Sequence, residues 1–275
     1  MEIKGILVSL LAPFEDHIAN GGEKLLGNAS YIKRRPDGRV YISGQMQRHV
    51  LFSAIDRLNN ADEAKGDTFV SNGDGITDKI ESDLRADMGG FMHPSKGDYS
   101  GRRTAPLSVT PAVAMKESEV GRDLLMRLRV KTEGENANEQ GIATREFSQG
   151  DIMRMNFFLD ITSLSISKAY RYENSFNVAT VYYKHATEAE RKRRAELYLN
   201  ATRLMNDYAN QARNAVCGEP QQVIIVFDTI LSRKAARYFE AGEIERANIL
   251  KELDERKAQY FIGDDTTENS VLKAY

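Results

Sequence analysis

The feature that most constrains the fold is the order in which strand-like and helix-like apolar patterns follow one another along the chain. Short apolar runs and alternating apolar and polar residues predict strands, whereas apolar residues spaced three or four apart predict helices. These patterns predict a strand at 3–12, a helix at 43–59, strands at 124–130 and 152–161, a helix from 187 to about 218, and a strand at 223–227. A further strand candidate lies at 178–183.

Start and stop signals support the two predicted helices. Ser43 is a favourable N-cap for the first helix, and Thr187 with Glu190 has the spacing of a capping box for the second. Gly218 and Pro220 are expected to end the second helix. The resulting βαββαβ order predicts an α+β fold of the ferredoxin-like or RNA-recognition-motif (RRM) type, which hosts many unrelated functions.

The predicted domain organisation is discontinuous. Residues 1–59 and 119–230 form a ferredoxin-like palm, and a polar arm at 131–150 joins two of its strands as an extended hairpin. Residues 60–118 contain many Gly, Asp, Ser and Asn residues without a long periodic segment, which is typical of an irregular insertion. Residues 231–275 are expected to be a charged helical segment, helical from 232 to about 260 and frayed over the last dozen residues.

The cysteine content and hydropathy of the 275 residues limit the compartment. A single cysteine, Cys217, excludes an internal disulfide framework and any zinc site built on several thiolates. The apolar run Gly5–Phe14 could be the core of a signal peptide, but Glu2 precedes it and no small-residue cleavage pattern follows, which favours a buried strand. No run of about 18 apolar residues predicts a membrane span. We therefore expect a cytoplasmic protein.

Motifs of common enzymes are missing from the sequence. It contains no phosphate-binding loop, no dinucleotide glycine fingerprint and no paired-histidine zinc helix. The acidic stretch around Asn72–Gly75 resembles a calcium loop loosely, but Thr77 stands where that loop needs glycine, which favours a solvated acidic loop. The four histidines lie without metal-ligand spacing: His17, His49, His93 and His185. The sequence therefore predicts no catalytic residue, no metal and no cofactor.

Charge is balanced overall but divided locally. The chain has 38 basic and 40 acidic residues, which excludes a uniformly basic coat for nucleic acid. Residues 24–49 nevertheless hold six basic residues and one acidic residue, whereas residues 59–83 hold two basic and seven acidic residues. A basic loop that enters the N-terminus of a helix can bind phosphate, because backbone N–H groups and the helix dipole both favour anions there. An ordinary solvated charge run explains the same pattern equally well.

Specific residues then resemble one family. The segment Gly38–Arg48 resembles the start of the first helix in the backbone subunit of Cascade-type CRISPR effector complexes. That family typically has a strand ending in Ser-x-Gln-x-x-Lys/Arg, and Ser43, Gln45 and Arg48 stand at these positions. The preceding Gly27–Ser30 resembles the loop that this family places between its first strand and first helix.

Two later segments extend the resemblance. Arg102–Pro111, which follows Asp87–Met92, is similar to an Arg-x-Ser-Pro-type segment of the family, and the arm at 131–150 with Ile142–Glu146 lies where the family has its thumb hairpin. The matches cover residues 1 to about 230 in the family's order. The chain is thus similar to type I, DevR-like members of the repeat-associated mysterious protein superfamily, with residues 60–118 as the fingers.

The resemblance implies a CRISPR RNA-binding structural protein and no enzyme. Several copies would line up along the guide RNA in a helical filament, hold its sugar-phosphate and leave its bases free to pair with target DNA in antiviral defence. The implied partners are CRISPR RNA, target DNA, further copies of the chain, the large subunit and the subunit that binds the guide 5′ end, with no membrane.

The resemblance also implies which residues contact RNA. Gln45 and Arg48 would bind phosphates, Ser43 would act as donor or only as a helix cap, and Ile142 with Thr144 would wedge at a kink of the strand. His49 is expected to stack or to lie on the helix surface. The full expected set is Asn28, Lys33, Arg34, Arg35, Arg39, Ser43, Gln45, Arg48, His49, Arg102, Arg103, Ile142, Thr144 and Arg145.

Two alternatives remain open at this stage. The first is a metal-dependent subunit of the type III kind, which cuts target RNA with an aspartate in the loop where this chain has Asn28, Ala29 and Ser30; here only Asp37 lies nearby. The second is a generic single-stranded RNA binder of RRM type. That binder would need an aromatic pair on the predicted strands, whose residues are instead mainly Ile, Leu, Met and Phe158.

Overall fold

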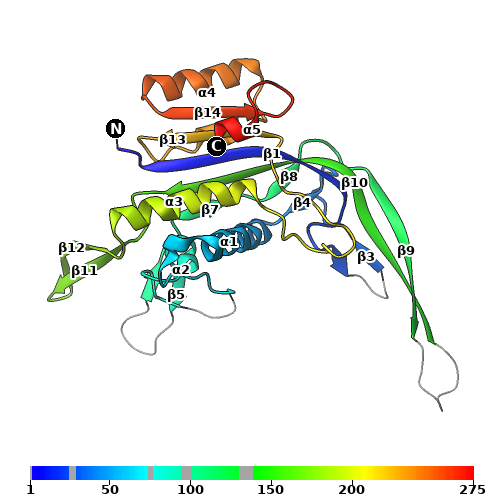
Figure 1. Cartoon of the computed structure of the whole chain (residues 1–275), viewed down its shortest axis with the longest axis horizontal. Coiled ribbons are helices and arrows are strands. Elements are labelled where there is room, and N and C mark those ends of the chain that lie inside the picture. Colours follow the sequence, from blue (N-terminus) through cyan, green and yellow to red (C-terminus); the bar gives the residue numbers. More distant parts are fainter. Residues whose placement is uncertain (1, 25–28, 74–76, 94–100, 130–138) are drawn as a thin grey trace, which may run out of the picture.

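The protein is a mixed α+β structure built on one large sheet (Figure 1). The computed structural model describes residues 2–24, 29–73, 77–93, 101–129 and 139–275. In these residues ten strands share one sheet, two smaller two-stranded sheets project from it, and five α-helices pack around them. The predicted α+β class is confirmed at this level.

The centre of the large sheet consists of three long antiparallel strands. β1 (Gly5–His17) pairs with β10 (Glu139–Asp160) on one side and with β13 (Gln222–Asp228) on the other. β14 (Gln259–Asp264) adds to β13 as an edge strand. The three strands predicted here at 3–12, 152–161 and 223–227 are confirmed, and two of them extend well beyond the predicted ends.

Short strands complete the sheet around β10, most of them antiparallel. Only β3 (Ala29–Tyr31) runs parallel to β10. The others are β2 (Glu23–Lys24), β4 (Tyr41–Ile42), β7 (Leu107–Val109), β8 (Ala112–Ala114) and β9 (Val120–Arg129). β7 and β8 lie inside the stretch 60–118, so the segment interpreted as an irregular insertion supplies two strands to the main sheet.

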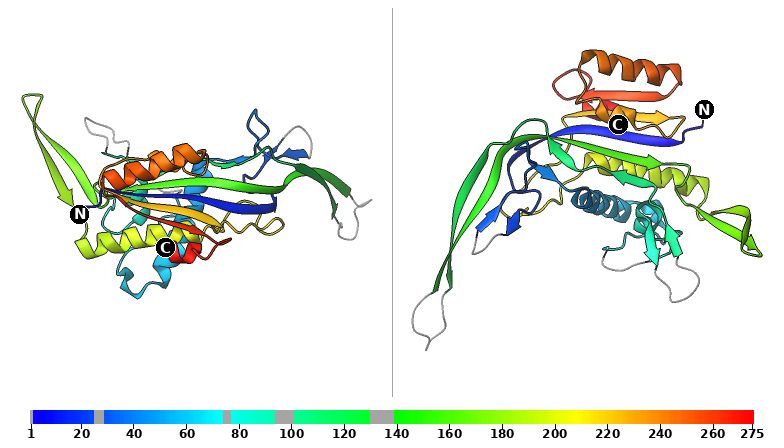
Figure 2. Two further views of the ribbon diagram at one scale, coloured as in Figure 1. Left: turned by 90° about the horizontal axis from the view of Figure 1, so that it is seen from above. Right: turned by 180° about the vertical axis from the view of Figure 1, so that it is seen from behind.

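Helices cover both faces of the sheet because its central strands are apolar on both sides. α1 (Gly44–Ala61) and α3 (Glu188–Arg203) pack on one face over Val8, Leu10 and their neighbours, whereas α4 (Glu243–Glu255) packs on the other face over Ile224 (Figure 2). In the described part of the chain, no helix is both long and apolar enough to cross a bilayer.

The first helix is confirmed, and the second is shorter than predicted. α3 ends at Arg203 instead of near residue 218. The chain then folds back as a loop that buries Met205 and Tyr208, and the N–H of Gly218 donates to Asn206 (3.3 Å). A Cβ at Gly218 would lie 2.0 Å from the carbonyl oxygen of Met205, so only glycine fits there. The apolar residues after 203 are therefore spaced for burial in a loop and do not form one face of a helix.

The C-terminal segment is only partly helical, contrary to expectation. A 3-10 turn, η2 (Lys234–Arg237), and α4 are followed by the strand β14 and by α5 (Val271–Ala274). Val271 and Ala274 are buried against the sheet, so the end of the chain is packed and not frayed. β14 begins where the predicted helix ends, and its short run with Phe261 and Ile262 both exposed has no strand alternation to reveal it.

A buried ion cluster attaches the segment predicted as an insertion to α3. This segment contains η1 (Glu63–Lys65), α2 (Leu84–Gly89) and the hairpin of β5 (Phe91–His93) with β6 (Gly101–Arg103). Asp87 on α2 is fully buried and accepts from Arg103 (2.6 Å) and from Arg194 on α3 (2.7 Å). These charges are satisfied mutually, which is the condition for burying them.

The strand candidate at 178–183 belongs to a second hairpin. β11 (Ile166–Glu173) and β12 (Phe176–Lys184) pair only with each other and project beyond α3 (Figure 1). The alternation of Tyr and Val was correctly interpreted as a strand, but this strand does not join the large sheet. This hairpin and the β9–β10 arm extend from opposite ends of the molecule.

Candidate nucleic-acid interface

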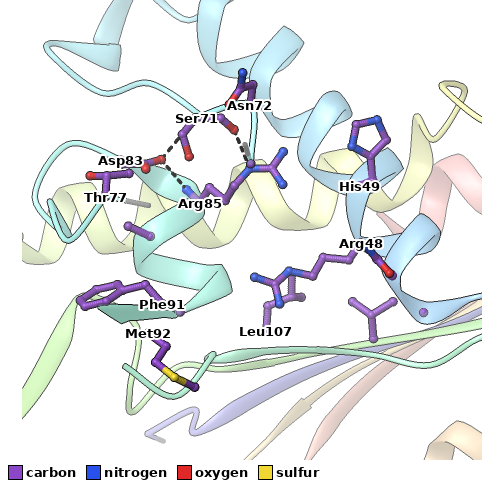
Figure 3. A pocket seen from close by; sticks show the side chains of 16 residues that line it. Arg48, His49, Ser71, Asn72, Thr77, Asp83, Arg85, Phe91, Met92 and Leu107 are labelled. Carbon is purple, nitrogen blue, oxygen red and sulfur yellow. Dashed lines mark hydrogen bonds between the residues drawn. The ribbon is translucent and has the colours of Figure 1, made fainter. Parts of the chain in front are cut away.

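The first turn of α1 presents a polar face. Ser43 is the N-cap, and its side-chain oxygen accepts from the backbone N–H of Met46 (3.2 Å), which confirms the predicted cap. Gln45, Arg48 and His49 are three and four residues apart and therefore lie on one side of the helix. All three line the same cavity (Figure 3).

The cavity is an open hollow of about 1120 Å³ between α1, α2, β5 and β7. α2 and the segment before it supply Ser71, Asn72, Asp83 and Arg85, and Phe91 and Met92 come from β5. The lining thus combines cationic, amide and hydroxyl groups with an aromatic and a thioether side chain, so it can take a ligand with both charged and flat apolar parts.

Two guanidinium groups flank one aromatic ring at the cavity. The carbon Cζ of Arg48 lies 5.7 Å from the Phe52 ring centroid, and that of Arg85 lies 4.6 Å from it. Arg48 also donates to the carbonyl oxygen of Gly89, which ties α1 to α2. Burial lowers the pKa of Arg48 from its ordinary value, although a guanidinium remains charged at neutral pH. The cavity wall therefore carries positive charge suited to an anionic ligand.

Asp83 adds an acceptor to the same wall. It caps α2, and its Oδ1 accepts from the backbone N–H groups of Arg85 (2.9 Å) and Ser71 (3.1 Å). Its Oδ2 is buried and meets no hydrogen-bond donor in the described part of the chain.

The second group of predicted residues lies at the base of the arm. β3 pairs with β10 at Ala29 opposite Thr144 and at Ser30 opposite Arg145, so the strand before the basic loop touches the arm. Arg34 lies 4.0 Å from the buried carboxylate of Glu146, to which Arg122 on β9 also donates (3.1 Å). The structure thus places Arg145 and the basic loop beside one another.

The basic loop at 33–39 is a tight turn. Gly38 has φ of +79°, and Arg39 donates to Asp37 (2.8 Å). On β10, burial lowers the pKa of Arg154, and the nearby positive charges of Arg35 and Arg39 lower it further against the opposing effect of Glu240. Arg154 is ion-paired with Glu240 (2.6 Å), and Arg39 with Asp37, so the charges of this region are largely paired within the chain.

The two arginines of β6 differ. Arg102 is exposed on the strand that pairs with Met92 of the cavity wall. Arg103 is buried, and its guanidinium donates to Asp87, to the carbonyl of Ile166 (2.7 Å) and to that of Ser163 (2.9 Å). Arg103 therefore holds the insertion to the second hairpin, and we do not retain it as an RNA contact.

The remaining predicted residues lie on the arm or outside the described residues. Ile142 and Thr144 are exposed on β10. Ile142 faces Met126 across the pair of strands, and Thr144 faces Leu124, so an aliphatic stripe runs along one face of the arm. Asn28 lies outside the residues that the structure describes.

Sequence reasoning missed three arginines of this surface: Arg85, Arg122 and Arg154. None of them stands at a motif position, since α2, β9 and β10 bring them to the surface only when the chain folds. The sequence shows that each is basic, but the residues around each form only an ordinary amphipathic pattern, which does not indicate a binding site.

The structure offers little for metal-dependent chemistry. Among the described residues no group of three or more His, Cys, Asp or Glu side chains is placed to hold a metal ion. In the stretch compared with a calcium loop, the carboxylate of Glu81 binds His185 (2.6 Å). The buried His17 binds Asp151 (2.8 Å), which in turn accepts from Ser118 and Ser148. These are bonds internal to the fold.

Comparison with known families decides the relationship. Residues 37–215, which include α1, the cavity lining and the arm, match the family described as CRISPR-associated negative auto-regulator DevR/Csa2. The chain belongs to this family. The family resemblance seen in the sequence is therefore confirmed, and the protein is a member of the CRISPR-associated DevR/Csa2 family. Comparison with curated protein sequences finds no match.

Solved structures share the fold of this DevR/Csa2-family chain. One chain of a "CRISPR RNA-guided surveillance complex" superposes with a TM-score of 0.56 at 15% identity, over 98% of this chain and 92% of that chain. A chain of a "CRISPR RNA-guided surveillance complex, pre-nicking" superposes with a TM-score of 0.54 at 13% identity, over 97% and 94%. At such identities the agreement concerns the fold alone, and it extends over nearly the whole chain.

Proposed function

We propose that the protein is the CRISPR RNA-binding backbone subunit of a type I surveillance complex, present in several copies along one guide RNA. The observation that carries the proposal is that a basic loop runs directly into the helix whose first turns line the cavity. The loop 33–39 leads through β4 into Ser43, and the next helical turns present Gln45, Arg48 and His49 to the cavity.

This surface suits a sugar-phosphate strand. Its groups are mostly guanidinium, amide and hydroxyl donors, which bind phosphate without selecting a base sequence. The proposed contacts are Lys33, Arg34, Arg35, Arg39, Ser43, Gln45, Arg48, His49, Arg102 and Arg145, together with Asn28 and the newly located Arg85, Arg122 and Arg154. Sequence selection would then be left to base pairing between guide and target DNA.

The ferredoxin-like palm is part of the proposal. The order β13-β1-β10, with β7, β8 and β9 beyond β10 and with α1 and α3 on one face, is what that fold requires of a βαββαβ chain. In this proposal the β9–β10 arm is the thumb, the fingers are the part of 60–118 that precedes β7, and 231–275 is a C-terminal addition that caps the second face.

Assembly into a filament explains the aliphatic stripe of the arm. Leu124 and Met126 are more than 60% exposed and Ile142 is 53% exposed, which is costly in an isolated chain. In the proposed complex, the stripe packs over the guide and against the next copy, and Ile142 with Thr144 wedges at the kink. The other partners are target DNA, the large subunit and the subunit at the guide 5′ end, all in the cytoplasm.

The proposed role is structural, without catalysis. The nuclease alternative depends on Asp37, whose carboxylate accepts two hydrogen bonds from Arg39, one from the backbone N–H (3.2 Å) and one from Nε (2.8 Å). A carboxylate used in this way stabilises a turn. No observation favours the nuclease alternative over the structural role, so we do not adopt it.

The proposal is tested by co-expressing the full chain with a guide RNA and the other complex subunits. We expect guide RNA to co-purify in a multimeric particle. Arg48→Glu and the milder Arg48→Gln should each reduce the retained RNA. The matched control is Arg237→Glu, which makes the same charge change at an exposed site on η2 and should retain RNA fully.

Two results would contradict the proposal. The first is recovery of the wild-type chain as an RNA-free monomer although guide and partner subunits are present. The second is equal RNA retention by wild type, Arg48→Gln and Arg237→Glu. A thermal melt of each variant separates lost RNA binding from lost folding, because Arg48 also bonds to Gly89.

A further inference from the structure

The β11–β12 hairpin exposes an unusual number of aromatic side chains. Tyr172 is 62% exposed, Tyr182 61% and Phe176 75%, and every residue of β12 is exposed. Solvated hairpins are normally rich in Thr, Lys and Glu, because exposed aromatic rings favour association. No role assigned to the cavity or to the arm uses this hairpin.

The base of the hairpin is held firmly, which argues against an adventitious loop. The buried Arg103 donates to the carbonyl oxygen of Ile166 at the start of β11 (2.7 Å). Ser167 bonds to His185 (2.6 Å), and His185 bonds to Glu81 of the insertion (2.6 Å). The strands are thus oriented by the body of the protein while their faces remain open to solvent.

One face of the hairpin combines aromatic rings with a cation. Lys168, Tyr170 and Tyr172 alternate along β11 and therefore share a face. Tyr182 lies directly opposite Lys168, whose ammonium group is 5.8 Å from the ring centroid. The register shifts between Arg171 and Tyr172 and places an extra residue on β12, so β11 keeps its alternation. Three tyrosines and one lysine therefore share one face of the hairpin, and Tyr182 contacts the lysine directly.

Charge identifies the kind of ligand. Residues 166–184 contain three basic residues and one acidic residue, although the whole chain has a net charge of −2. Lys184 lies opposite Ile166 and so shares the face of Lys168, and its ion pair with Glu188 is exposed, so a polyanion can displace the carboxylate at small cost. Tyrosines next to cations suit stacked bases and phosphates, whereas the aliphatic stripe of the arm suits protein.

We propose that the tyrosine face of the β11–β12 hairpin binds a second single strand of nucleic acid, without sequence preference, by stacking its bases on Tyr170, Tyr172 and Tyr182. The site is separate from the proposed guide path, because none of these residues lines the cavity at α1. The inference rests on the proposed function only for the statement that the first strand is the guide.

The test measures binding of fluorescein-labelled oligo(dT), which is not complementary to the guide, to guide-loaded particles by fluorescence anisotropy. We expect Tyr170→Ala/Tyr172→Ala/Tyr182→Ala to weaken oligo(dT) binding by at least about tenfold, since each stacked base is lost. The corresponding triple phenylalanine variant should bind like wild type, because it keeps the rings. Tyr183→Ala is the matched control, an exposed tyrosine that faces Ser167 on the opposite side of the hairpin.

Guide retention is measured in the same samples and separates this inference from the proposed function. If the wild-type chain retains no guide, the proposed function fails, but guide-free chain still reports whether the tyrosine face binds oligo(dT). Unchanged oligo(dT) binding by the alanine variant overturns the inference. So does a loss of particle size with oligo(dT) binding intact, which would assign the tyrosines to a protein contact. A thermal melt and the phenylalanine variant exclude misfolding as the cause.

Discussion

Two hairpins project from this molecule, and they differ in how they are built. The β9–β10 arm shares its long strand with the central sheet, since β10 pairs with β1 along most of its C-terminal half. The β11–β12 hairpin is a sheet of its own and is held only at its base. In both cases a buried carboxylate marks the attachment: Asp151 at the arm and Asp87 beneath the hairpin.

Their exposed faces differ in chemistry as well. The arm presents aliphatic side chains and the hairpin presents tyrosines, although both are two-stranded antiparallel hairpins of ordinary geometry. Secondary structure therefore does not distinguish their roles. The attachment determines how rigidly each hairpin is presented, and the side-chain type determines which partner it suits.

The largest effect is expected from removing the anchor of the hairpin. Asp87→Ala should lower the free energy of unfolding by about 3–5 kcal/mol, because it leaves Arg103 and Arg194 buried without their carboxylate. Urea denaturation measures this change. Arg102→Ala, the exposed neighbour, should stay within about 0.5 kcal/mol of wild type. A loss below about 1 kcal/mol for Asp87→Ala would show that the hairpin is not anchored in this way.

The anchor of the arm should have a smaller and pH-dependent effect. Asp151→Asn is expected to cost about 1.5–3 kcal/mol at neutral pH, because the carboxylate accepts from His17, Ser118 and Ser148. Burial raises the pKa of Asp151, but these hydrogen bonds outweigh burial and leave the pKa below its ordinary value.

The sign of the pH dependence follows from that lowered pKa. A carboxylate whose pKa is depressed in the folded state stabilises the protein fully above the pKa of the unfolded chain, about 3.9. This stabilisation is lost as the pH falls from that value through the lower pKa of the folded state. Wild type should therefore lose more stability than Asp151→Asn between neutral pH and about pH 3. Parallel stability curves for the two proteins would contradict this assignment.

The arm surface should matter for assembly and not for folding. Replacing Leu124, Met126 and Ile142 together by Ser removes an exposed stripe, so the melting temperature should stay near that of wild type. Association between copies should weaken about tenfold or more if the stripe packs against a neighbour. Native mass spectrometry of guide-loaded particles measures this. The triple tyrosine variant of the hairpin is the comparison, and its particles should keep their size.

The smallest effect is expected at Lys168 on the tyrosine face of the hairpin. Lys168→Gln removes one cation from the proposed strand path, so the slope of log affinity for oligo(dT) against log salt should fall by about 0.7. Affinity at low salt should change only modestly. An unchanged slope would place Lys168 away from the strand. Arg145→Gln, which removes one cation from the arm, should leave this slope unaltered.

Local signals predicted the parts of the fold that depend on local chemistry. Ser43 caps α1 because its oxygen reaches an N–H three residues later, and Thr187 caps α3 in the same way. The predicted capping box is only half formed, since the carboxylate of Glu190 binds Arg193 and Arg194 instead of the backbone of Thr187. Where an interaction spans one helical turn, the sequence is sufficient to predict it.

The same rule separates the residues of the candidate site that could be predicted from those that could not. Gln45, Arg48 and His49 were predicted together because their spacing puts them on one helix face, and the structure confirms that placement. Arg85 could not be predicted, because it reaches the cavity through the packing of α2 against α1. Arg103 has the sequence surroundings of a binding residue, yet a buried carboxylate 16 positions away makes it part of the core.

By itself, the sequence determined the order of strands and helices, the start of each main helix and the family resemblance, because these depend on periodicity and on neighbours within a few positions. The tertiary structure decided where α3 stops, that β14 joins the sheet and that 178–183 leaves it, since each depends on contacts between distant segments. It also decided which cations meet at one surface, and which tyrosines face solvent instead of the core. Charge and exposure act through space, so only the folded chain can set them.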